Sequence, residues 1–327
     1  MTAMCCLPGV SQNNNIKKVH VVFKTHLDIG FTELSSIVEQ RYIDEFIPKA
    51  IAVSEQLHNE NAEERYVWTT GSWVISEYLQ HAAPEAIQKI EEAISKGYIV
   101  WNGVPYTVQS EIMSRDLFET VLNLSEQLDR KYGKKTVAAK MTDVPGHTRS
   151  IVTPLSDAGI SFLHIGVNPA ATVPDVPELC RWRNIDGKEI VLMYQKDYGD
   201  DIVLPDRQTV FTLKFTGDNH GPHTATQVKR IFTSLRSKYP NARIMASTLN
   251  DVYQEIEPYK GELPIVDSEI GDTWIHGFGS SPVRLARYRE LSRLYSEWIK
   301  NGKMDKNNDA AILFAVRLGL EIGRAHV

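Results

Sequence analysis

The feature that most constrains the fold is the alternation of short apolar runs with longer segments of helical period. This alternation is typical of an α/β layer with a mainly parallel sheet. The runs that we predict as strands are residues 19–25, 66–69, 98–101, 137–141, 162–166, 190–194, 210–215, 243–248 and 265–266. The segments that we predict as helices are residues 36–57, 84–96, 115–131, 150–158, 224–239 and 250–256. We therefore predict an α/β domain with a seven-stranded, mainly parallel sheet in a distorted, barrel-like arrangement.

The composition changes after residue 280. Two helical segments follow each other there without a strand, which predicts the start of a helical bundle. We expect an irregular N-terminal segment over residues 1–17, an α/β catalytic domain over 18–280 and a truncated bundle domain over 281–320. We interpret residues 321–327 as a sequence artefact, because they add no cap to the helix that they follow.

Charge and composition exclude several classes of protein. The 327 residues carry a formal net charge of −5, and no basic stripe of the kind that phosphate backbones require is present, so we expect no nucleic acid partner. No apolar run is long enough to predict a membrane span. The N-terminus lacks an intact signal peptide, which predicts a cytoplasmic protein by default, or a periplasmic or secreted one if the N-terminus is incomplete. The oligomeric state stays open.

Polar residues follow several of the predicted strands directly. In a parallel α/β sheet, ligands collect outside the carboxyl ends of the strands, so we expect these loops to converge on one side. The pairs concerned are His26 and Asp28, Asp143 and His147, Asp200 and Asp201, and Asp218 and His220.

The pair His26 and Asp28 suits a metal ion. Side chains two residues apart in an extended segment lie on the same face, so a histidine nitrogen and a carboxylate oxygen can reach one ion. Asp143 is the natural donor of a third ligand. Gly30 and Gly146 allow the backbone to turn tightly beside the ion or a sugar.

Two motifs resemble a known family. "THLDIGF", which contains His26, and "TDVPGHT", which contains Asp143, are similar to the paired zinc signature of glycoside hydrolase family 38, the α-mannosidase-like retaining enzymes. The segment "GYIVWNGVPYTVQSEIMSRDLF" is similar to an aromatic, Glu-containing stretch of that family. The resemblance is close only in these three segments, which indicates a divergent branch of the family.

The resemblance implies a zinc site and a nucleophile. His26, Asp28 and Asp143 would bind one Zn²⁺ ion, and Asp143 would also attack the anomeric carbon. A retaining glycosidase needs a second, protonated carboxyl group about 5 to 5.5 Å from the nucleophile. In the family, this general acid lies in a Gly-Asp-Asp loop after a later strand. Asp218 has the better position relative to the following helix and strand, whereas Asp201 lies in a Gly-Asp-Asp sequence. We favour Asp218 over Asp201.

The resemblance also suggests residues that contact the carbohydrate substrate. The fourth zinc ligand of the family is a histidine from a downstream helical region, and here it is unassigned, with His276 as the nearest substitute. Phe31 stands where the family has a tryptophan that shapes the sugar subsite. The residues that we expect at the substrate site are Phe31, Trp101, Tyr106, Glu111 and His147.

Three functions compete at this point. The first is a zinc-dependent retaining glycoside hydrolase that acts on α-mannosides or related sugars and is impaired in this truncated chain. The second is a metal-dependent polysaccharide deacetylase-like hydrolase, which would use an aspartate as base and release acetate. The third is a carbohydrate-binding relative without turnover.

Overall fold

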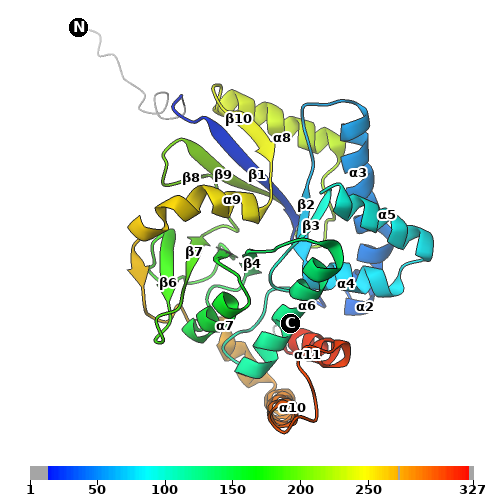
Figure 1. The fold of residues 1–327 in the computed structure, drawn as a ribbon, viewed down its shortest axis with the longest axis vertical. Coiled ribbons are helices and arrows are strands. Elements are labelled where there is room, and N and C mark those ends of the chain that lie inside the picture. The colour runs from blue at the N-terminus through cyan, green and yellow to red at the C-terminus, as the bar shows by residue number, and fades with distance from the viewer. Residues whose placement is uncertain (1–13, 272, 324–327) are drawn as a thin grey trace.

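A computed structural model describes residues 14–271 and 273–323, whose strands form two mainly parallel sheets (Figure 1). The strands of the first sheet are Lys18–Thr25 (β1), Trp68–Gly71 (β2), Ile99–Asn102 (β3), Ile202–Val203 (β8), Thr209–Thr216 (β9) and Arg243–Ala246 (β10). The strands of the second are Ala138–Asp143 (β4), Phe162–Val167 (β5), Leu179–Arg183 (β6), Glu189–Gln195 (β7) and Ile265–Val266 (β11). The first sheet has the order β3-β2-β1-β9-β8, with β10 also paired to β1, and the second has the order β11-β6-β7-β5-β4.

The α/β class and the predicted strands are confirmed, but the single barrel-like sheet is not. The described strands divide into a six-stranded and a five-stranded sheet that do not close into a barrel. The sequence analysis missed β6 and β8. In β6 the buried Cys180 and Trp182 alternate with half-buried arginines, so this antiparallel strand is not an apolar run.

The helices lie between and around the strands in the expected alternation. They are Ser35–Arg41 (α2), Ile47–Asn59 (α3), Ser72–His81 (α4), Pro84–Ser95 (α5), Arg115–Tyr132 (α6), Val152–Asp157 (α7), Ala225–Lys238 (α8), Leu249–Ile256 (α9), Pro282–Lys300 (α10) and Asp309–Gly323 (α11). Helix α4 was not predicted. The helix predicted over residues 36–57 is interrupted by a π-helical turn at Tyr42–Phe46, which separates α2 from α3. Short 3₁₀ segments are Arg149–Ile151, Glu257–Glu262 and Thr273–Ser280.

A second, smaller apolar core fills the space between the two sheets. Val22 and Phe211 of the first sheet and Phe162 and Met193 of the second belong to it, all fully buried. One face of helix α9 packs against this core. From this face, the ring of Tyr253 stacks on that of Phe162, with centroids 6.0 Å apart. The two sheets are therefore packed against each other on their inner faces.

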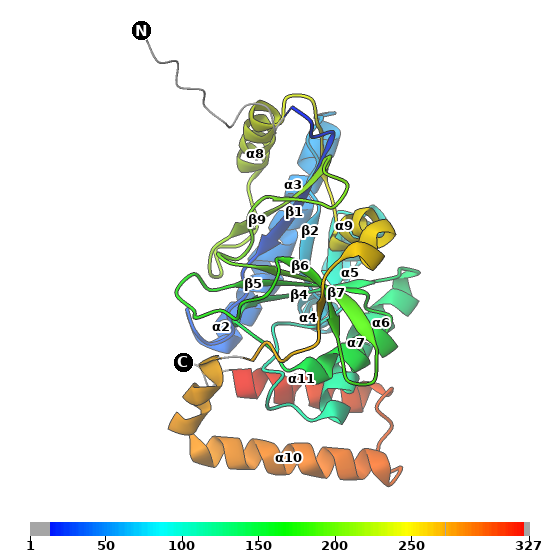
Figure 2. The same ribbon diagram turned by 90° about the vertical axis from the view of Figure 1, so that its left-hand side faces the viewer.

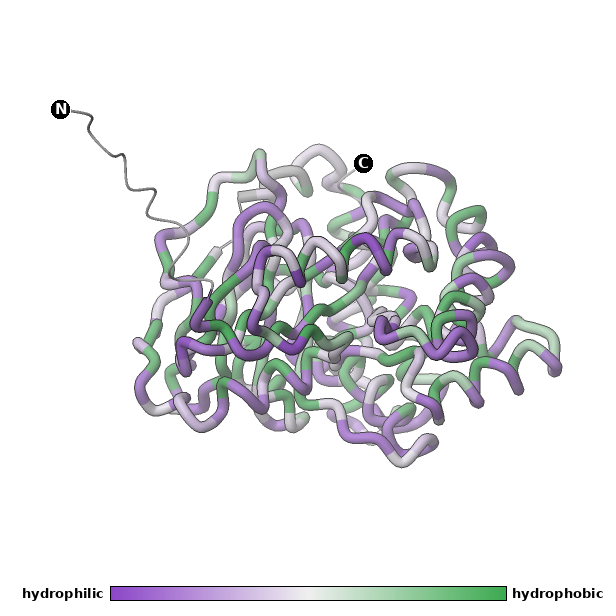
Figure 3. Tube along the Cα trace, turned by 90° about the horizontal axis from the view of Figure 1, so that it is seen from above, coloured by the Kyte–Doolittle hydropathy of each residue, from purple (hydrophilic) through white to green (hydrophobic). Residues whose placement is uncertain are grey.

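The larger core lies between the sheets and the outer helices. Figure 3 shows hydrophobic and hydrophilic residues alternating along these helices, as expected for helices with one buried face. Helices α10 and α11 lie side by side at one end of the molecule (Figure 2) and both contact α6. Tyr295 of α10 stacks on Phe314 of α11 at 5.6 Å, and its hydroxyl lies 2.6 Å from Oγ1 of Thr120 in α6. The two predicted helices are thus present and pack against α6 of the α/β layer, but a helical bundle is not confirmed.

Most of the site residues lie at the carboxyl ends of strands, namely β1, β4, β5, β7 and β9. Parallel pairing aligns β1 with β9 over its whole length, from Lys18 to Thr25, and aligns Asp143 at the end of β4 with Val167 at the end of β5. This register brings loops that are distant in sequence to one end of the sheets.

Within the described part of the chain, no helix has the length and apolar character that crossing a bilayer requires.

Candidate active site

His26, Asp28 and Asp218 come together at the carboxyl ends of β1 and β9. One ligand atom from each residue lies within 4.8 Å of those of the other two. Nε2 of His26 is 3.2 Å from Oδ1 of Asp28, and the histidine side chain is only 5% exposed. A buried imidazole that faces carboxylates is a common arrangement in metal sites and in acid–base catalysis.

Asn219 holds the two loops of this group together, and the sequence analysis did not single it out. Its backbone N–H donates to the carbonyl of His26 at 3.0 Å. Its side chain accepts from the N–H of Asp28 at 3.1 Å and donates to the carbonyl of Asp28 at 2.7 Å. Asn219 has a φ of 51°, a conformation that asparagine tolerates better than most residues. Asp218 therefore sits beside His26 because its neighbour is bonded to the loop after β1.

Asp143 ends β4 in the second sheet, and two side chains hold its carboxylate. Its Oδ1 accepts from Nδ2 of Asn168 at 2.9 Å and from the hydroxyl of Tyr198 at 2.8 Å. Its φ is 82°, which is unusual for a residue other than glycine and is found mainly where the surrounding structure enforces it. The ring of Tyr198 is also 5.6 Å from the ring of His26, so this tyrosine lies between the two parts of the site.

Electrostatics links the same groups. Burial raises the pKa of Tyr198, and the hydrogen bond and charge of Asp143 and the charges of Asp218 and Asp28 raise it further. The phenol is therefore neutral and acts as a hydrogen-bond donor. Asp143 and Asp218 approach this tyrosine from different sheets, and the site lies at the junction of the two.

The loop that carries Tyr198 has a strained backbone. Asp197, Tyr198 and Gly199 have φ values of 55°, 65° and 122° in succession. The backbone N–H of Tyr198 donates to the carbonyl of Val167 at 3.0 Å. Gly166 permits this approach, because a Cβ there would lie 2.2 Å from the carbonyl oxygen of Tyr198. The loop is thus pressed onto β5 at a position that only glycine allows.

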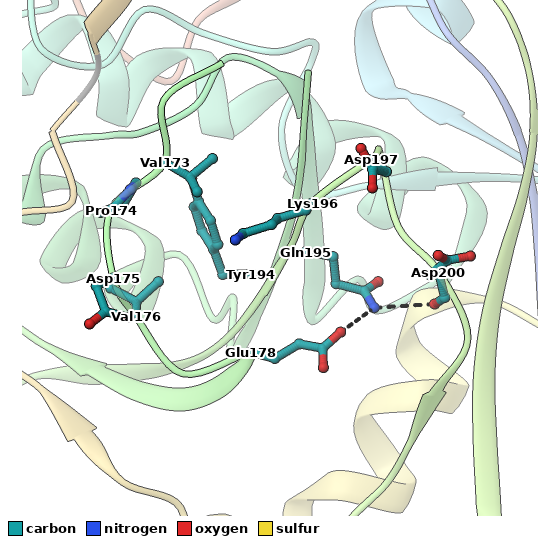
Figure 4. Close-up of a pocket in the computed structure, with 10 residues that line it drawn as sticks. All are labelled: Val173, Pro174, Asp175, Val176, Glu178, Tyr194, Gln195, Lys196, Asp197 and Asp200. Atoms are coloured by element: carbon teal, nitrogen blue, oxygen red, sulfur yellow. Dashed lines mark hydrogen bonds between the residues drawn. The ribbon is translucent and has the colours of Figure 1, made fainter. Parts of the chain in front are cut away.

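A cavity of about 470 Å³ lies beside this loop, lined by residues after β5 and β7 (Figure 4). Asp197 and Asp200 line it, whereas Tyr198 between them does not. The amide of Gln195 donates to Oε1 of Glu178 at 2.8 Å and to the carbonyl of Asp200 at 3.1 Å, as the dashed lines in Figure 4 mark. The volume is in the range of small-molecule sites, and the lining is mainly polar and acidic.

Two buried lysines lie in the interior near the site. Lys24 precedes His26 by two residues on β1, and Nζ of Lys140 on β4 is 2.8 Å from Nδ1 of His164. Burial lowers the pKa of Lys24, and the charge of Asp28 raises it by less, so that the pKa is about 8. Burial and then the charge of Lys24 lower the pKa of Lys140.

The donor set of the first group fits a zinc ion. One imidazole nitrogen and carboxylate oxygens are ligands that Zn²⁺ accepts, and donor atoms within 4.8 Å of one another can share one ion. The buried Nδ1 of His26 has no hydrogen-bond partner among the described residues, so the ring is not committed to a structural hydrogen bond there. Asp143, the predicted third ligand, is not in this group; the structure places Asp218 there with His26 and Asp28.

Asp201, the alternative general acid, lies in an ion-pair network elsewhere. Its carboxylate accepts from Thr212 and, at 2.7 Å, from Nζ of Lys238. Burial raises its pKa, but hydrogen bonds from Lys238 and Thr212 and the charge of Lys214 outweigh burial and lower the pKa to about 2. A general acid needs a raised pKa, so this environment opposes that role.

Two predicted substrate residues are built into the packing instead. Nε1 of Trp101 donates to Asp129 of α6 at 2.9 Å, and the ring is 7% exposed. The hydroxyl of Tyr106 donates to the carbonyl of Val316 in α11 at 2.5 Å. Both side chains therefore anchor helices on the outer face of the sheet. Phe31, by contrast, is 65% exposed in the loop after Asp28.

Glu111 and His147 meet the segment that contains Ile270. The backbone N–H of His147 donates to the carbonyl of Ile270 at 2.8 Å, and its Nδ1 is 3.0 Å from Oγ of Ser110. Burial lowers the pKa of His147 to about 3, so the ring is neutral. A Cβ on Gly271 would lie 3.2 Å from Oε1 of Glu111, so this side chain faces the same segment.

Gly146 has a packing role rather than one beside an ion. A Cβ there would lie 2.0 Å from the carbonyl oxygen of Ile270, so the two backbones touch. The side chain of His276, named as a substitute for the fourth zinc ligand, lies outside the described side chains.

Sequence signals for the missed residues were present but weak. Tyr198 lies in the "YGDD" segment and Asn219 in the "TGDNHGP" segment, both of which were noted for their aspartates. Asn168 directly follows β5, one residue beyond the position after the strand predicted over residues 162–166. A tyrosine or asparagine at a strand end is too common to be selected without knowledge of which strands are neighbours.

Comparisons with known proteins agree with the fold. An α-mannosidase from Enterococcus faecalis V583 superposes with a TM-score of 0.63 at 14% identity, covering 78% of this chain and 31% of that one. A protein in the glycosyl hydrolase family 38 from Enterococcus faecalis gives 0.54 at 12% identity, covering 78% and 29%. A 4-alpha-glucanotransferase from Thermococcus litoralis gives 0.50 at 12% identity, covering 93% and 46%. The chain thus spans about a third of the length of the two enterococcal proteins, and curated proteins give no match.

Sequence comparison identifies the family. Residues 17–260 match the family described as "Glycosyl hydrolases family 38 N-terminal domain". The match covers more than half of the chain and includes both motifs, the loops after β1 and β4, and Asp218. The chain therefore belongs to glycosyl hydrolase family 38.

Proposed function

We propose that this chain carries the catalytic domain of a zinc-dependent retaining glycoside hydrolase that acts on α-mannosides or related sugars. The observation that carries the proposal is the approach of Asp143, Asp218, Asp28 and His26 to Tyr198 from two sheets. Two carboxyl groups with different surroundings are what a retaining glycosidase requires. Family membership supports the same chemistry, and the α-mannosidase among the similar structures suggests the sugar.

We assign Asp143 as the nucleophile. Its Oδ1 is held by Tyr198 and Asn168, which fixes the carboxylate and leaves its other oxygen for attack on the anomeric carbon. The two donors orient the carboxylate toward the loops after β1 and β9, where Tyr198 contacts His26. The bond from the anomeric carbon to the leaving oxygen breaks as the bond to Asp143 forms.

We assign Asp218 as the general acid and base. It would give its proton to the leaving oxygen in the first step and take a proton from the attacking water in the second, which releases Asp143. Asn219 positions it through the loop contacts to His26 and Asp28. Its environment also differs from that of Asp143, which is held by neutral donors.

His26 and Asp28 would hold the zinc ion with a third carboxylate. When bound there, the ion would supply Lewis-acid chemistry that orients sugar hydroxyls and stabilises negative charge on a carboxylate. The family resemblance favours Asp143 as the third ligand, which leaves Asp218 free to act as the general acid. The 4.8 Å grouping favours Asp218 instead, and in that case Asp218 would be ionised on the metal and could not donate the proton. Zinc content of the purified D143N and D218N variants separates these two assignments, because the ligand variant loses zinc and the other retains it.

Covalent trapping tests the proposal without requiring fast turnover. An activated fluorosugar with α-mannosyl configuration should form an ester on Asp143, which peptide mass spectrometry identifies. The D143A variant should show no adduct, and a D201N variant should react as the native chain does. An adduct on another residue would contradict the assignment of Asp143. Absence of any adduct, together with acetate release from acetylated polysaccharides, would favour the deacetylase-like alternative.

A further inference from the structure

Three metal-ligating side chains meet away from the candidate active site. They are Glu39 on α2 and Glu77 and His81 on α4, and one ligand atom of each lies within 4.8 Å of those of the other two. Glu77 and His81 are four residues apart, so they share one face of their helix. Nε2 of His81 is 3.2 Å from Oε2 of Glu77. Figure 1 labels both helices.

Burial and orientation distinguish this group from an ordinary acidic patch. Glu77 is only 6% exposed, and its Oε1 accepts from Nε1 of Trp73 at 3.0 Å, which fixes the plane of the carboxylate. Oε2 is thereby turned toward His81. The side chain of His81 is 49% exposed, so the group is open to solvent on the histidine side.

The two carboxylates share one histidine, His81, as their cationic neighbour. Glu39 lies within hydrogen-bond reach of Glu77, and neither carboxylate pairs with a lysine or arginine in residues 14–271 and 273–323. Buried carboxylates in proteins are normally paired with cations or bound to metals, because desolvation of an unpaired charge is costly. Two carboxylates in contact need either a shared proton or a cation between them.

We propose that Glu39, Glu77 and His81 form a second divalent-cation site that ties α2 to α4. The set of one imidazole nitrogen and two carboxylate oxygens suits Zn²⁺, whereas Ca²⁺ and Mg²⁺ prefer all-oxygen sites. Helix α2 begins at Ser35, soon after the loop that carries Asp28 and Phe31. Cation binding would therefore brace the helix that continues from the active-site loop.

Zinc stoichiometry of the purified full chain tests the proposal. The native chain should bind two zinc ions, and H81A should bind one. His81 is half exposed, so its replacement leaves the core intact. H58A, which removes an exposed histidine on α3, is the matched control and should bind two ions. D28N should also lose one ion, but a different one, so the H81A/D28N double variant should lose both.

A stability measurement separates a cation from a shared proton. Zinc should raise the melting temperature of the D28N variant, and the rise should disappear in D28N/H81A and in D28N/E39Q. If H81A binds as much zinc as the native chain, the second site does not exist. If E39Q stabilises the chain in chelator and zinc has no effect on D28N, the two glutamates share a proton and the proposal is wrong. Neither result depends on hydrolase activity, so failure of this site differs from failure of the proposed function.

Discussion

Tyr198 donates a hydrogen bond to Asp143, with 2.8 Å between the phenol oxygen and Oδ1 of the carboxylate. The two residues come from the carboxyl ends of β7 and β4 and are 55 positions apart. The strained loop at Asp197, Tyr198 and Gly199 exists in this conformation because Gly166 lets its backbone touch β5. Strain of this kind is concentrated at functional sites, where it positions side chains.

Replacement of Tyr198 by phenylalanine should lower kcat/KM about 10- to 100-fold. A hydrogen bond to a charged group is worth about 1.5 to 3 kcal/mol, and each 1.36 kcal/mol corresponds to about tenfold in rate. Hydrolysis of an aryl α-mannoside measures the effect. Y132F is the matched control, because it removes a phenol that donates to Glu91 on α5, away from the site. Equal kinetics for Y198F and the native chain would exclude a role in positioning Asp143.

Replacement of Gly146 by alanine should destabilise the chain by about 1 to 3 kcal/mol, the usual cost of overpacking. The new Cβ would lie 2.0 Å from the carbonyl oxygen of Ile270 and 2.4 Å from that of Gly271, so backbone must move. Chemical denaturation measures the free energy of unfolding. G261A is the control, since a Cβ there meets no atom within 4 Å. A similar small change in the free energy of unfolding of both variants would show that the backbone at Ile270 can move without loss of stability.

Replacement of Tyr106 by phenylalanine should lower stability and leave KM unchanged. The variant removes the hydrogen bond that the phenol donates to the carbonyl of Val316, and such a bond contributes about 0.5 to 1.5 kcal/mol. A thermal melt and Michaelis–Menten kinetics on the same preparation separate the two effects. A raised KM at native stability would restore the substrate-binding role expected from the sequence.

Replacement of Asp201 by asparagine should destabilise the chain by about 2 kcal/mol at pH 7 and progressively less at low pH. The folded-state pKa of about 2 lies below the ordinary value of 3.8, so the ionised carboxylate stabilises the fold above pH 3.8. That contribution is lost as pH falls from 3.8 to about 2. Urea denaturation of both proteins between pH 7 and pH 2.5 measures the convergence. E55Q, at an exposed position on α3, is the matched control for the loss of one carboxylate.

A constant difference between D201N and the native chain across this pH range would show that the network with Lys238 contributes through packing rather than charge. Catalysis offers an independent check. If Asp201 is structural, D201N should retain native kcat/KM at temperatures where it is folded.

The α/β class, most strands and the family could be predicted from the order of residues alone, because apolar periodicity and short motifs are local properties of the chain. The sequence also indicated that His26 and Asp28 face the same way, since an extended segment has a period of two. It did not separate one sheet from two, and it missed the antiparallel β6, whose arginines interrupt the apolar pattern.

Which strand ends are neighbours became clear from the folded chain. That arrangement placed Asp218 rather than Asp143 closest to His26 and Asp28, and it tied Asp201 to Lys238 in a separate network. It also turned Trp101 and Tyr106 toward outer helices. Such contacts depend on sheet register and on the close approach of backbones, which join residues far apart in the chain. They therefore produce no periodic pattern in the amino-acid sequence.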